Sequence, residues 1–364
     1  MKRHGNLYNQ ICSLENLQMA DAIARIGKKN RSEIKAFDKN REANLMELRD
    51  ILLYKEYCTS KYTLKKVYDP KEREVSKCKY YPDLIVQHSI MIPLKSILIS
   101  SFTADTYSSI PGRGTHQASD ALTRALRNVD ATKYCLKLDV KKFYQNIDHD
   151  VLKYLLRRKI KDKDLLWLLD EIIDSAPGLP IGNFISGYFA NYYLSGLDHY
   201  LKENLKVKNY FRYMDDIVIP GSDKPYLHQI LSHIRIYFQK RLNLEIKDNY
   251  QIFPVAARGI DAFGWVHFHT HKRLRKRIKK NFARAVAKNP NGPGIPSYYG
   301  LAVHADCNHL LNKLLYDNKK FQGFKYCGKN KRVRRKKNRY IRSNGQRDSG
   351  SGLQSDSIKI SGKV

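Results

Sequence analysis

The sequence predicts an α+β fold, in which helices and short strands follow one another without a repeating order. Three observations carry this prediction. Apolar residues recur at helical spacing within residues 7–50, a long tyrosine-rich helix is expected at 183–204, and short β-forming runs stand at 134–139 and 210–219. We find no internal repeat, so a solenoid or propeller is not expected.

The chain is strongly basic. Its 364 residues include 67 Lys and Arg against 35 Asp and Glu, which gives a formal net charge of +32. A charge of this size favours a polyanionic partner, and nucleic acid is the most common one. With 42% hydrophobic and 11% aromatic residues, the chain also has enough core-forming side chains to exclude a mostly disordered, histone-tail-like protein.

Neither a membrane span nor export is expected. The longest apolar stretch, 84–102, is interrupted by Gln87, His88 and Lys95, which would be stranded in lipid. The basic N-terminus is followed by no short apolar segment of the kind found in signal peptides. The six cysteines form no C-x-x-C pair, which is typical of reduced thiols. These features together predict a cytoplasmic protein without membrane contact.

The N-terminal third reads mainly as helices. Met19, Ile23 and Ile26 recur at four and then three residues, and a second helix is expected through residues 45–52. A turn-rich basic segment at 62–75 separates these helices from the apolar stretch.

The central third places acids at the ends of elements. In the strand expected at 134–139, alternation puts Cys135, Lys137 and Asp139 on one face. Asp148 stands where a helix N-cap is expected, ahead of an apolar periodic run. At 210–219 two β-forming runs flank Asp215 and Asp216, which is typical of a hairpin with the acids at its tip.

The last third predicts a helix at 224–242 and a strand at 258–268. Seven of the nine residues from 272 to 280 are basic, and we expect this run to open a separate helical module. From 327 onward the pattern gives way to a basic run and a Ser/Gly-rich tail, which predicts a disordered RNA-binding arm or a segment that only aids solubility.

Asp139, Asp215 and Asp216 are the candidate catalytic residues. Acids clustered at strand ends repel one another unless cations neutralise them, and carboxylate oxygens suit two Mg²⁺ ions, with Mn²⁺ as the alternative. Two such ions, about 3.5–4 Å apart, can activate a 3′-hydroxyl and stabilise leaving pyrophosphate. Taken singly, Asp-Asp is also a common turn dipeptide and Asp139 a plain strand-end residue.

Three motifs in order resemble the palm of a reverse transcriptase. They are Asp139-Val-Lys-Lys-Phe-Tyr144, the segment from Gly178 to Asn191, and Tyr213-Met-Asp-Asp216. The resemblance implies a right-hand polymerase fold with fingers, an antiparallel-sheet palm and a small helical thumb. The implied boundaries are 1–65 for an N-terminal helical extension, 66–138 for fingers and first palm elements, 139–268 for the palm with a nucleotide-binding loop and helix at 177–204, 269–326 for the thumb, and 327–364 for the tail.

The same resemblance assigns roles to further residues. Tyr144 corresponds to the steric gate that excludes a 2′-hydroxyl, although a buried aromatic is the plain alternative. The implied nucleotide-binding residues are Lys71, Arg73, Tyr144, Ile181, Gly182 and Lys247, with Lys71 and Arg73 open to a simpler reading as solvated charges. The implied metal ligands are the three aspartates and the backbone carbonyl of Val140. The implied nucleic-acid contacts are Arg113, Gly264, Lys272, Arg273, Arg275 and Lys276.

One motif narrows the resemblance to reverse transcriptases of diversity-generating retroelements, from bacteria or phages. Ile181-Gly182-Asn-Phe-Ile-Ser186 is similar to their Ile-Gly-x-x-x-Ser-Gln pattern, and Gly187 replaces the final Gln. Such enzymes copy a template RNA into cDNA with errors at adenines, use dNTPs, hold an RNA/cDNA hybrid and work with a small basic helical accessory protein. Ile181 is open to a reading as ordinary packing. The alternatives are a group II intron-like or retron-like reverse transcriptase, or a catalytically silent palm that binds RNA.

Overall fold

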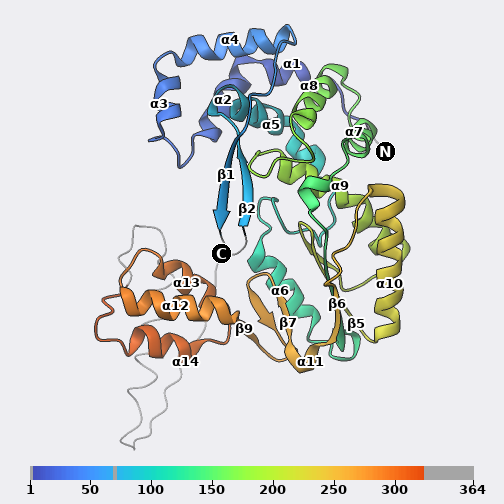
Figure 1. Cartoon of the computed structure of the whole chain (residues 1–364), viewed down its shortest axis with the longest axis vertical. Coiled ribbons are helices and arrows are strands. Elements are labelled where there is room, and N and C mark those ends of the chain that lie inside the picture. The colour runs from blue at the N-terminus through green and yellow to red at the C-terminus, as the bar shows by residue number, and fades with distance from the viewer. Residues whose placement is uncertain (1–2, 69–71, 324–364) are drawn as a thin grey trace, which may run out of the picture.

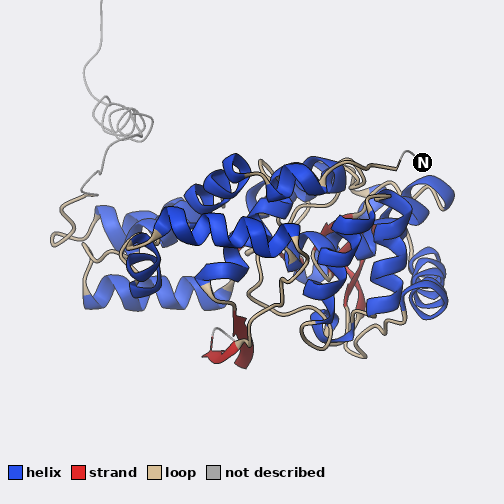
Figure 2. Cartoon of the chain, turned by 90° about the horizontal axis from the view of Figure 1, so that it is seen from above, coloured by secondary structure: helices blue, strands red, loops and turns tan. Residues whose placement is uncertain are grey.

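The computed structural model describes residues 3–68 and 72–323. Helices outnumber strands in this part of the chain (Figure 2). The helices are α1 Tyr8–Cys12, α2 Leu14–Ala24, α3 Ser32–Asp38, α4 Arg41–Leu53, α5 Ile85–Ile99, α6 Thr115–Ala125, α7 His149–Lys159, α8 Lys163–Asp174, α9 Ser186–His199, α10 Lys224–Tyr237, α11 Val255–Arg258, α12 Lys276–Lys288, α13 Ile295–Ala302 and α14 Asn308–Leu311. Shorter helical turns are η1 Tyr80–Leu84, η2 Asp130–Thr132, η3 Phe143–Asn146, η4 Tyr200–Asn204, η5 Phe238–Leu242 and η6 Asn312–Tyr316.

The strands form three antiparallel sheets. They are β1 Thr63–Tyr68, β2 Glu72–Lys77, β3 Tyr134–Asp139, β4 Phe211–Tyr213, β5 Asp216–Gly221, β6 Gln251–Pro254, β7 Ile260–Ala262, β8 Trp265–His267 and β9 Lys272–Leu274. The central sheet has the order β4-β5-β3-β6, β1 pairs with β2, and β7-β8-β9 form the third sheet. The mixed helix-and-sheet architecture expected from the sequence is confirmed.

The central sheet separates two hydrophobic cores. Side chains alternate along β3, so that Leu136 and Leu138 join the larger core while Cys135 joins the smaller one. The larger core includes the N-terminal helices and α7–α10, and the smaller one includes α6, the third sheet and the C-terminal helices. In Figure 1, helices α12–α14 form a lobe to one side of the sheets, and α1–α4 lie at the end from which the β1–β2 ribbon extends.

Local signals explain several boundaries. The Asp148 side chain accepts a hydrogen bond from the Val151 N–H at 3.0 Å, which confirms the expected N-cap of α7. Helix α10 begins in the same way at Asp223, with a proline in its first turn. The apolar stretch forms α5, whose side chains are largely buried. None of the helices within 3–68 and 72–323 combines the length and apolar character of a bilayer span.

The helix expected from the spacing of Met19 and Ile23 is present as α2, although both side chains are exposed and its buried face carries Leu17 and Ala20, among others. Two other expectations about local structure are wrong. Residues 63–68 and 72–77 pair as strands rather than forming a turn-rich segment. The sequence did not predict these strands because β1 is exposed along its whole length, so its residues show no alternation of apolar and polar side chains.

The second wrong expectation concerns the basic run at 272–280. Lys272 to Leu274 form strand β9, which pairs with β8, and helix α12 starts only at Lys276. Charge composition cannot separate a strand edge from a helix start, since both leave basic side chains toward solvent. The predicted tail at 327–364 lies outside the described residues.

Candidate active site

The three predicted acids meet at one end of the central sheet. Asp139 is the last residue of β3 and lies directly opposite Asp216, the first residue of β5. Tyr213 pairs with the same Asp216, so Met214 and Asp215 form the two-residue turn of the β4–β5 hairpin. The Asp139 carboxyl interacts with Asp215 as well as Asp216. The expected hairpin and the convergence of its acids with Asp139 are therefore present.

The carboxylates are desolvated and crowded. Burial, followed by the neighbouring Asp139 carboxylate, raises the pKa of Asp215 to about 7. Burial also raises the pKa of Asp216, with Lys137 opposing the shift and Asp139 adding to it. Such a site disfavours its own negative charge, and a bound cation would relieve it.

Two lysines lie beside the acids. The Lys247 ammonium forms an ion pair with Asp139, and the Lys247 N–H donates to the Asp139 carbonyl oxygen at 2.9 Å. Lys137 Nζ lies 3.9 Å from Asp216 Oδ1. Val140, which directly follows β3, is buried and forms an antiparallel β-bridge with Ile246. The end of β3 is therefore held by β5 on one side and by the segment at 246–247 on the other.

Tyr144 of η3 lies beside the Met214–Asp215 turn, and the segment before α9 contacts the β1–β2 ribbon. The Tyr144 hydroxyl lies 3.6 Å from Met214 Sδ, and burial, then the nearby Asp215, raises the pKa of Tyr144 to about 12. The Ile181 carbonyl accepts a hydrogen bond from the Ser76 N–H of β2 at 2.7 Å. Gly182 has φ +127°, and a Cβ there would lie 2.3 Å from the Ser76 carbonyl oxygen. The glycine is required here by the approach of β2.

These positions belong to a known domain. Residues 81–249 match the family model described as "Reverse transcriptase (RNA-dependent DNA polymerase)". The chain contains a reverse transcriptase domain.

Curated relatives share parts of the chain. "Protein YkfC" of Escherichia coli is 24% identical over 68% of this chain and 75% of its own length. "Group II intron-encoded protein LtrA" of Lactococcus lactis is 28% identical over 35% of this chain and 22% of its own length. An "Uncharacterized 91 kDa protein in cob intron" of Schizosaccharomyces pombe is 29% identical over 41% of this chain, which spans 19% of that protein. An apo telomerase structure from Candida tropicalis covers 64% of this chain and 53% of its own, at 12% identity and a TM-score of 0.46.

The donor set of the reverse transcriptase domain fits a hard divalent cation. Three carboxylates supply oxygen ligands from adjacent strand ends, and the raised pKa values of Asp215 and Asp216 indicate that the negative charge of these two groups lacks full compensation. Within the described ranges, no group of three or more His, Cys, Asp or Glu side chains is already arranged around one metal position, and Lys247 is the present partner of Asp139. Asp139, Asp215 and Asp216 would hold the ions once Lys247 withdraws.

The other predicted site residues are dispersed. Arg113 Nη1 donates to the carbonyl oxygen of Thr103 at 2.7 Å, so the guanidinium braces a loop. Lys272 Nζ lies 3.0 Å from Asp120 Oδ1 and over the Trp265 ring, and its side chain is only 13% exposed. A phosphate contact from Lys272 would require these partners to be released.

The remaining predicted contacts surround the third sheet and α12. Gly264, with φ +99°, lies in the β7–β8 turn and faces open space. Arg273 stacks over Phe268, Arg275 pairs with Asp261, and Lys276 is exposed at the start of α12. Arg73 pairs through its backbone with Val67, and Lys71 lies outside the described residues.

Sequence analysis assigned no structural role to the residues that anchor the loop before α9. Gln87 Oε1 accepts a hydrogen bond from the Phe184 N–H at 2.8 Å, and His88 stacks on the Phe184 ring at 3.9 Å. Both polar residues are buried on α5. Their presence in an otherwise apolar run was the available signal, since a buried polar side chain needs a partner.

We expect Mg²⁺ binding to weaken about tenfold between pH 8 and pH 6. With its pKa raised to about 7, Asp215 is mostly ionised at pH 8 and mostly protonated at pH 6, where a cation must displace the proton. The same shift means that the metal-free fold loses stability as the pH rises from about 4 to about 7, because the folded state holds this proton more tightly than the unfolded chain. Calorimetric titration with Mg²⁺ at both pH values measures the change.

Asp215→Asn is the control, because this variant cannot release the Asp215 proton. Calorimetry in two buffers of different ionisation enthalpy then reports proton release in the wild type and less in the variant. A wild-type affinity that is equal at pH 6 and pH 8 would contradict the raised pKa.

Proposed function

We propose that this chain is an RNA-directed DNA polymerase that extends a primer with dNTPs along a template RNA by two-metal nucleotidyl transfer. The observation that carries the proposal is the meeting of Asp139 with Asp215 and Asp216 at the ends of adjacent strands, inside a reverse transcriptase domain. Two Mg²⁺ ions, when bound, would activate the primer 3′-hydroxyl and stabilise the leaving pyrophosphate. The proposed palm is thus the central sheet, with the β1–β2 ribbon as part of the fingers and α12–α14 as the thumb.

The chain's own residues supply positioning and charge. Tyr144 lies next to the catalytic turn, where its ring can close the space that a 2′-hydroxyl would need. The Lys247 ammonium is paired with Asp139. If a metal ion took its place on Asp139, the ammonium would be free to neutralise negative charge on the leaving pyrophosphate. Exposed Lys276, Lys279 and Lys280 on α12 offer phosphate contacts to the RNA/cDNA hybrid.

The deciding experiment is primer extension on an RNA template with Mg²⁺ and four dNTPs. We expect extension by the full chain and none by the Asp215→Ala/Asp216→Ala variant. Equal extension by both proteins would assign the activity to a contaminant, and absence of extension by the wild type on every template would favour the silent RNA-binding palm. Binding of the same template by fluorescence anisotropy separates a silent palm from a protein that does not bind RNA.

For the subtype, we propose a diversity-generating retroelement, in which the cDNA carries errors at template adenines and a small basic helical accessory protein assists. The support is Ile181-Gly182 in the loop before α9 and Ser186 at the start of α9, with the Ile181 carbonyl hydrogen-bonded to the Ser76 N–H of β2. A group II intron-like enzyme is the second candidate, favoured by the similarity to LtrA.

Changing Ile181→Gln is expected to lower the error frequency opposite adenine several-fold. A glutamine amide can hydrogen-bond the nucleotide sugar, and one such bond adds about 0.5–1.5 kcal/mol of discrimination. Sequencing of cDNA made by wild type and variant on one template measures the spectrum. Ile181→Val, which stays apolar, is the control, and an unchanged adenine spectrum in the Gln variant would reject this role for Ile181.

A further inference from the structure

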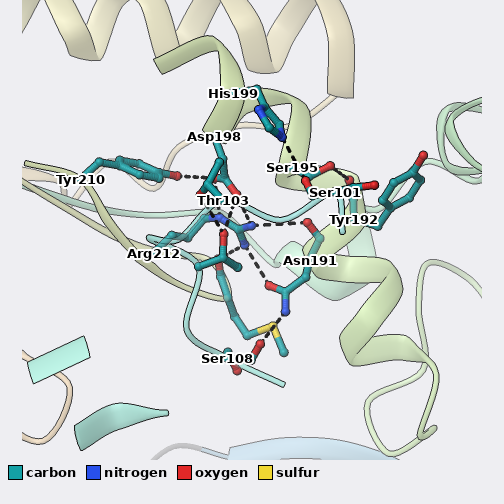
Figure 3. Close-up of polar contacts among 12 residues, drawn as sticks. Ser101, Thr103, Ser108, Asn191, Tyr192, Ser195, Asp198, His199, Tyr210 and Arg212 are labelled. Carbon is teal, nitrogen blue, oxygen red and sulfur yellow. Dashed lines mark hydrogen bonds and ion pairs between the residues drawn. The ribbon is translucent and has the colours of Figure 1, made fainter. Parts of the chain in front are cut away.

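Arg212 stands immediately before Tyr213 of the β4–β5 hairpin, and its side chain points toward Asp198 and Asn191 of α9 (Figure 3). Its guanidinium and the Asp198 carboxylate of α9 are both fully buried. Arg212 Nε donates to Asp198 Oδ1 at 2.7 Å, and Nη2 donates to Oδ2 at 2.5 Å. Burying a bidentate ion pair of this kind is costly unless all its polar atoms find partners.

The partners are present on both carboxylate oxygens. Asp198 Oδ1 also accepts from the Tyr210 hydroxyl at 2.6 Å, and Oδ2 accepts from the Thr106 hydroxyl at 2.9 Å. The main chain of Arg212 is fixed as well, since its N–H donates to the Asp105 carbonyl at 2.9 Å. The network therefore joins α9, the loop at 105–108 and strand β4 into one rigid unit.

The remaining guanidinium nitrogen reaches the catalytic turn. Arg212 Nη1 donates to the Met214 carbonyl oxygen and to Asn191 Oδ1, both at 3.0 Å, and Asn191 in turn donates to the Ser108 carbonyl at 2.7 Å. Met214 has φ +55°, a left-handed conformation that is unfavourable for a residue with a side chain. The Met214 carbonyl belongs to the peptide bond between Met214 and Asp215. A hydrogen bond to this carbonyl therefore restricts the orientation of the Asp215 backbone, from which the carboxylate extends.

We propose that the buried Arg212–Asp198 pair is a positioning device for the catalytic turn, which holds Met214 left-handed and thereby aims Asp215 at the metal site. The role in turnover rests on the proposed polymerase function, whereas the conformational role does not. Buried ion pairs can often be exchanged for apolar residues with little loss of stability. Such an exchange would keep the fold yet remove the donor to Met214, which separates positioning from mere stabilisation.

A second Asp–Arg pair, whose aspartate is fully buried and whose arginine is 17% exposed, provides a control. Asp21 is also fully buried, is held by Arg25 at 2.7 Å and accepts from the Tyr80 hydroxyl, so it repeats the Asp–Arg–Tyr chemistry. It lies among the N-terminal helices, where Arg41 is its additional partner. Losing it should affect folding as strongly as losing the Asp198 pair, but not the catalytic turn.

The experiment compares Arg212→Leu/Asp198→Leu, Arg212→Lys and the control Arg25→Leu/Asp21→Leu with wild type. The chain has five methionines, so methyl-¹³C-methionine NMR on the full metal-free chain gives few signals, and Met214→Leu assigns the one of interest. Met214 Sδ is close to the Tyr144 ring, so its methyl shift reports the conformation of the turn. Steady-state primer extension over a range of dNTP concentrations gives kcat and the KM for dNTP.

We expect both Arg212 variants to move or broaden the Met214 signal, to leave buried Met91 unchanged, and to lower kcat at least tenfold with little change in KM for dNTP. The control variant should leave Met214 and kcat unchanged. An unmoved Met214 signal or a wild-type kcat in either folded Arg212 variant would overturn the proposal. If the double variant fails to fold, Arg212→Lys, which keeps the charge but not the fork, decides alone. A wild type without polymerase activity would defeat the proposed function, while the NMR result would still test the positioning.

Discussion

Asp139→Asn should lower kcat for nucleotide addition by about 10³-fold or more, an amount typical of losing one charged group that stabilises a transition state. The substitution keeps the size of the side chain but removes one negative charge from the proposed metal site. Asp139 is the link between the strands, since it lies opposite Asp216 and contacts Asp215. Single-turnover extension at saturating dNTP measures the rate, and anisotropy with labelled primer–template should show unchanged affinity.

A neighbouring ion pair on the same two segments provides the control for this prediction. Glu245 forms an ion pair with Lys141, as Asp139 does with Lys247, across the same pair of segments. The Glu245 side chain is 71% exposed and points to solvent. Glu245→Gln should therefore change kcat less than twofold, as is usual for surface ion pairs. A rate for Asp139→Asn close to that of Glu245→Gln would remove Asp139 from the catalytic set.

Tyr144→Ala should reduce the preference for dNTPs over rNTPs by about 10²-fold, the scale on which a shaped pocket rejects one extra hydroxyl group. The Tyr144 ring is held in place by Phe143 at its edge and by Met214 at its hydroxyl. Removing the ring opens the volume in which a 2′-hydroxyl would clash. The ratio of kcat/KM for matched dNTP and rNTP on one template gives the preference directly.

Tyr144→Phe separates the ring from its hydroxyl. This variant loses the contact to Met214 Sδ but keeps the aromatic plane, so most of the preference should remain. Loss of selectivity in both variants would indicate that the hydroxyl acts through Met214. Retained selectivity in the alanine variant would show that another group excludes the 2′-hydroxyl.

The three candidate catalytic acids could be found by sequence analysis because their signals are local. A strand with period two, a polar tip between β-forming runs and fixed spacing to Tyr144 are properties of short segments, and they placed Asp139 and the Asp215–Asp216 pair correctly at neighbouring strand ends. The helix expected at 183–204 is present as α9 and η4 for the same reason.

The supporting network was not accessible in this way. Arg212 and Asp198 are 14 residues apart, and their pairing depends on how α9 packs against the hairpin. From composition alone, Arg212 in a basic chain looks like one more solvated cation, although it is fully buried. Strand β9 escaped prediction similarly, because only its partner β8 makes Lys272 to Leu274 extended. Long-range pairing leaves little trace in local spacing.

The hydrogen bond between the β1–β2 ribbon and the loop before α9 limits what side-chain mutagenesis can reveal. The bond from the Ser76 N–H to the Ile181 carbonyl joins main chain to main chain, so it survives replacement of either side chain. Alanine scanning would leave this hydrogen bond intact and would give no phenotype, even if the position of the loop depends on it. Only a proline at position 76, which removes the donor itself, would reveal how firmly the two segments are tied.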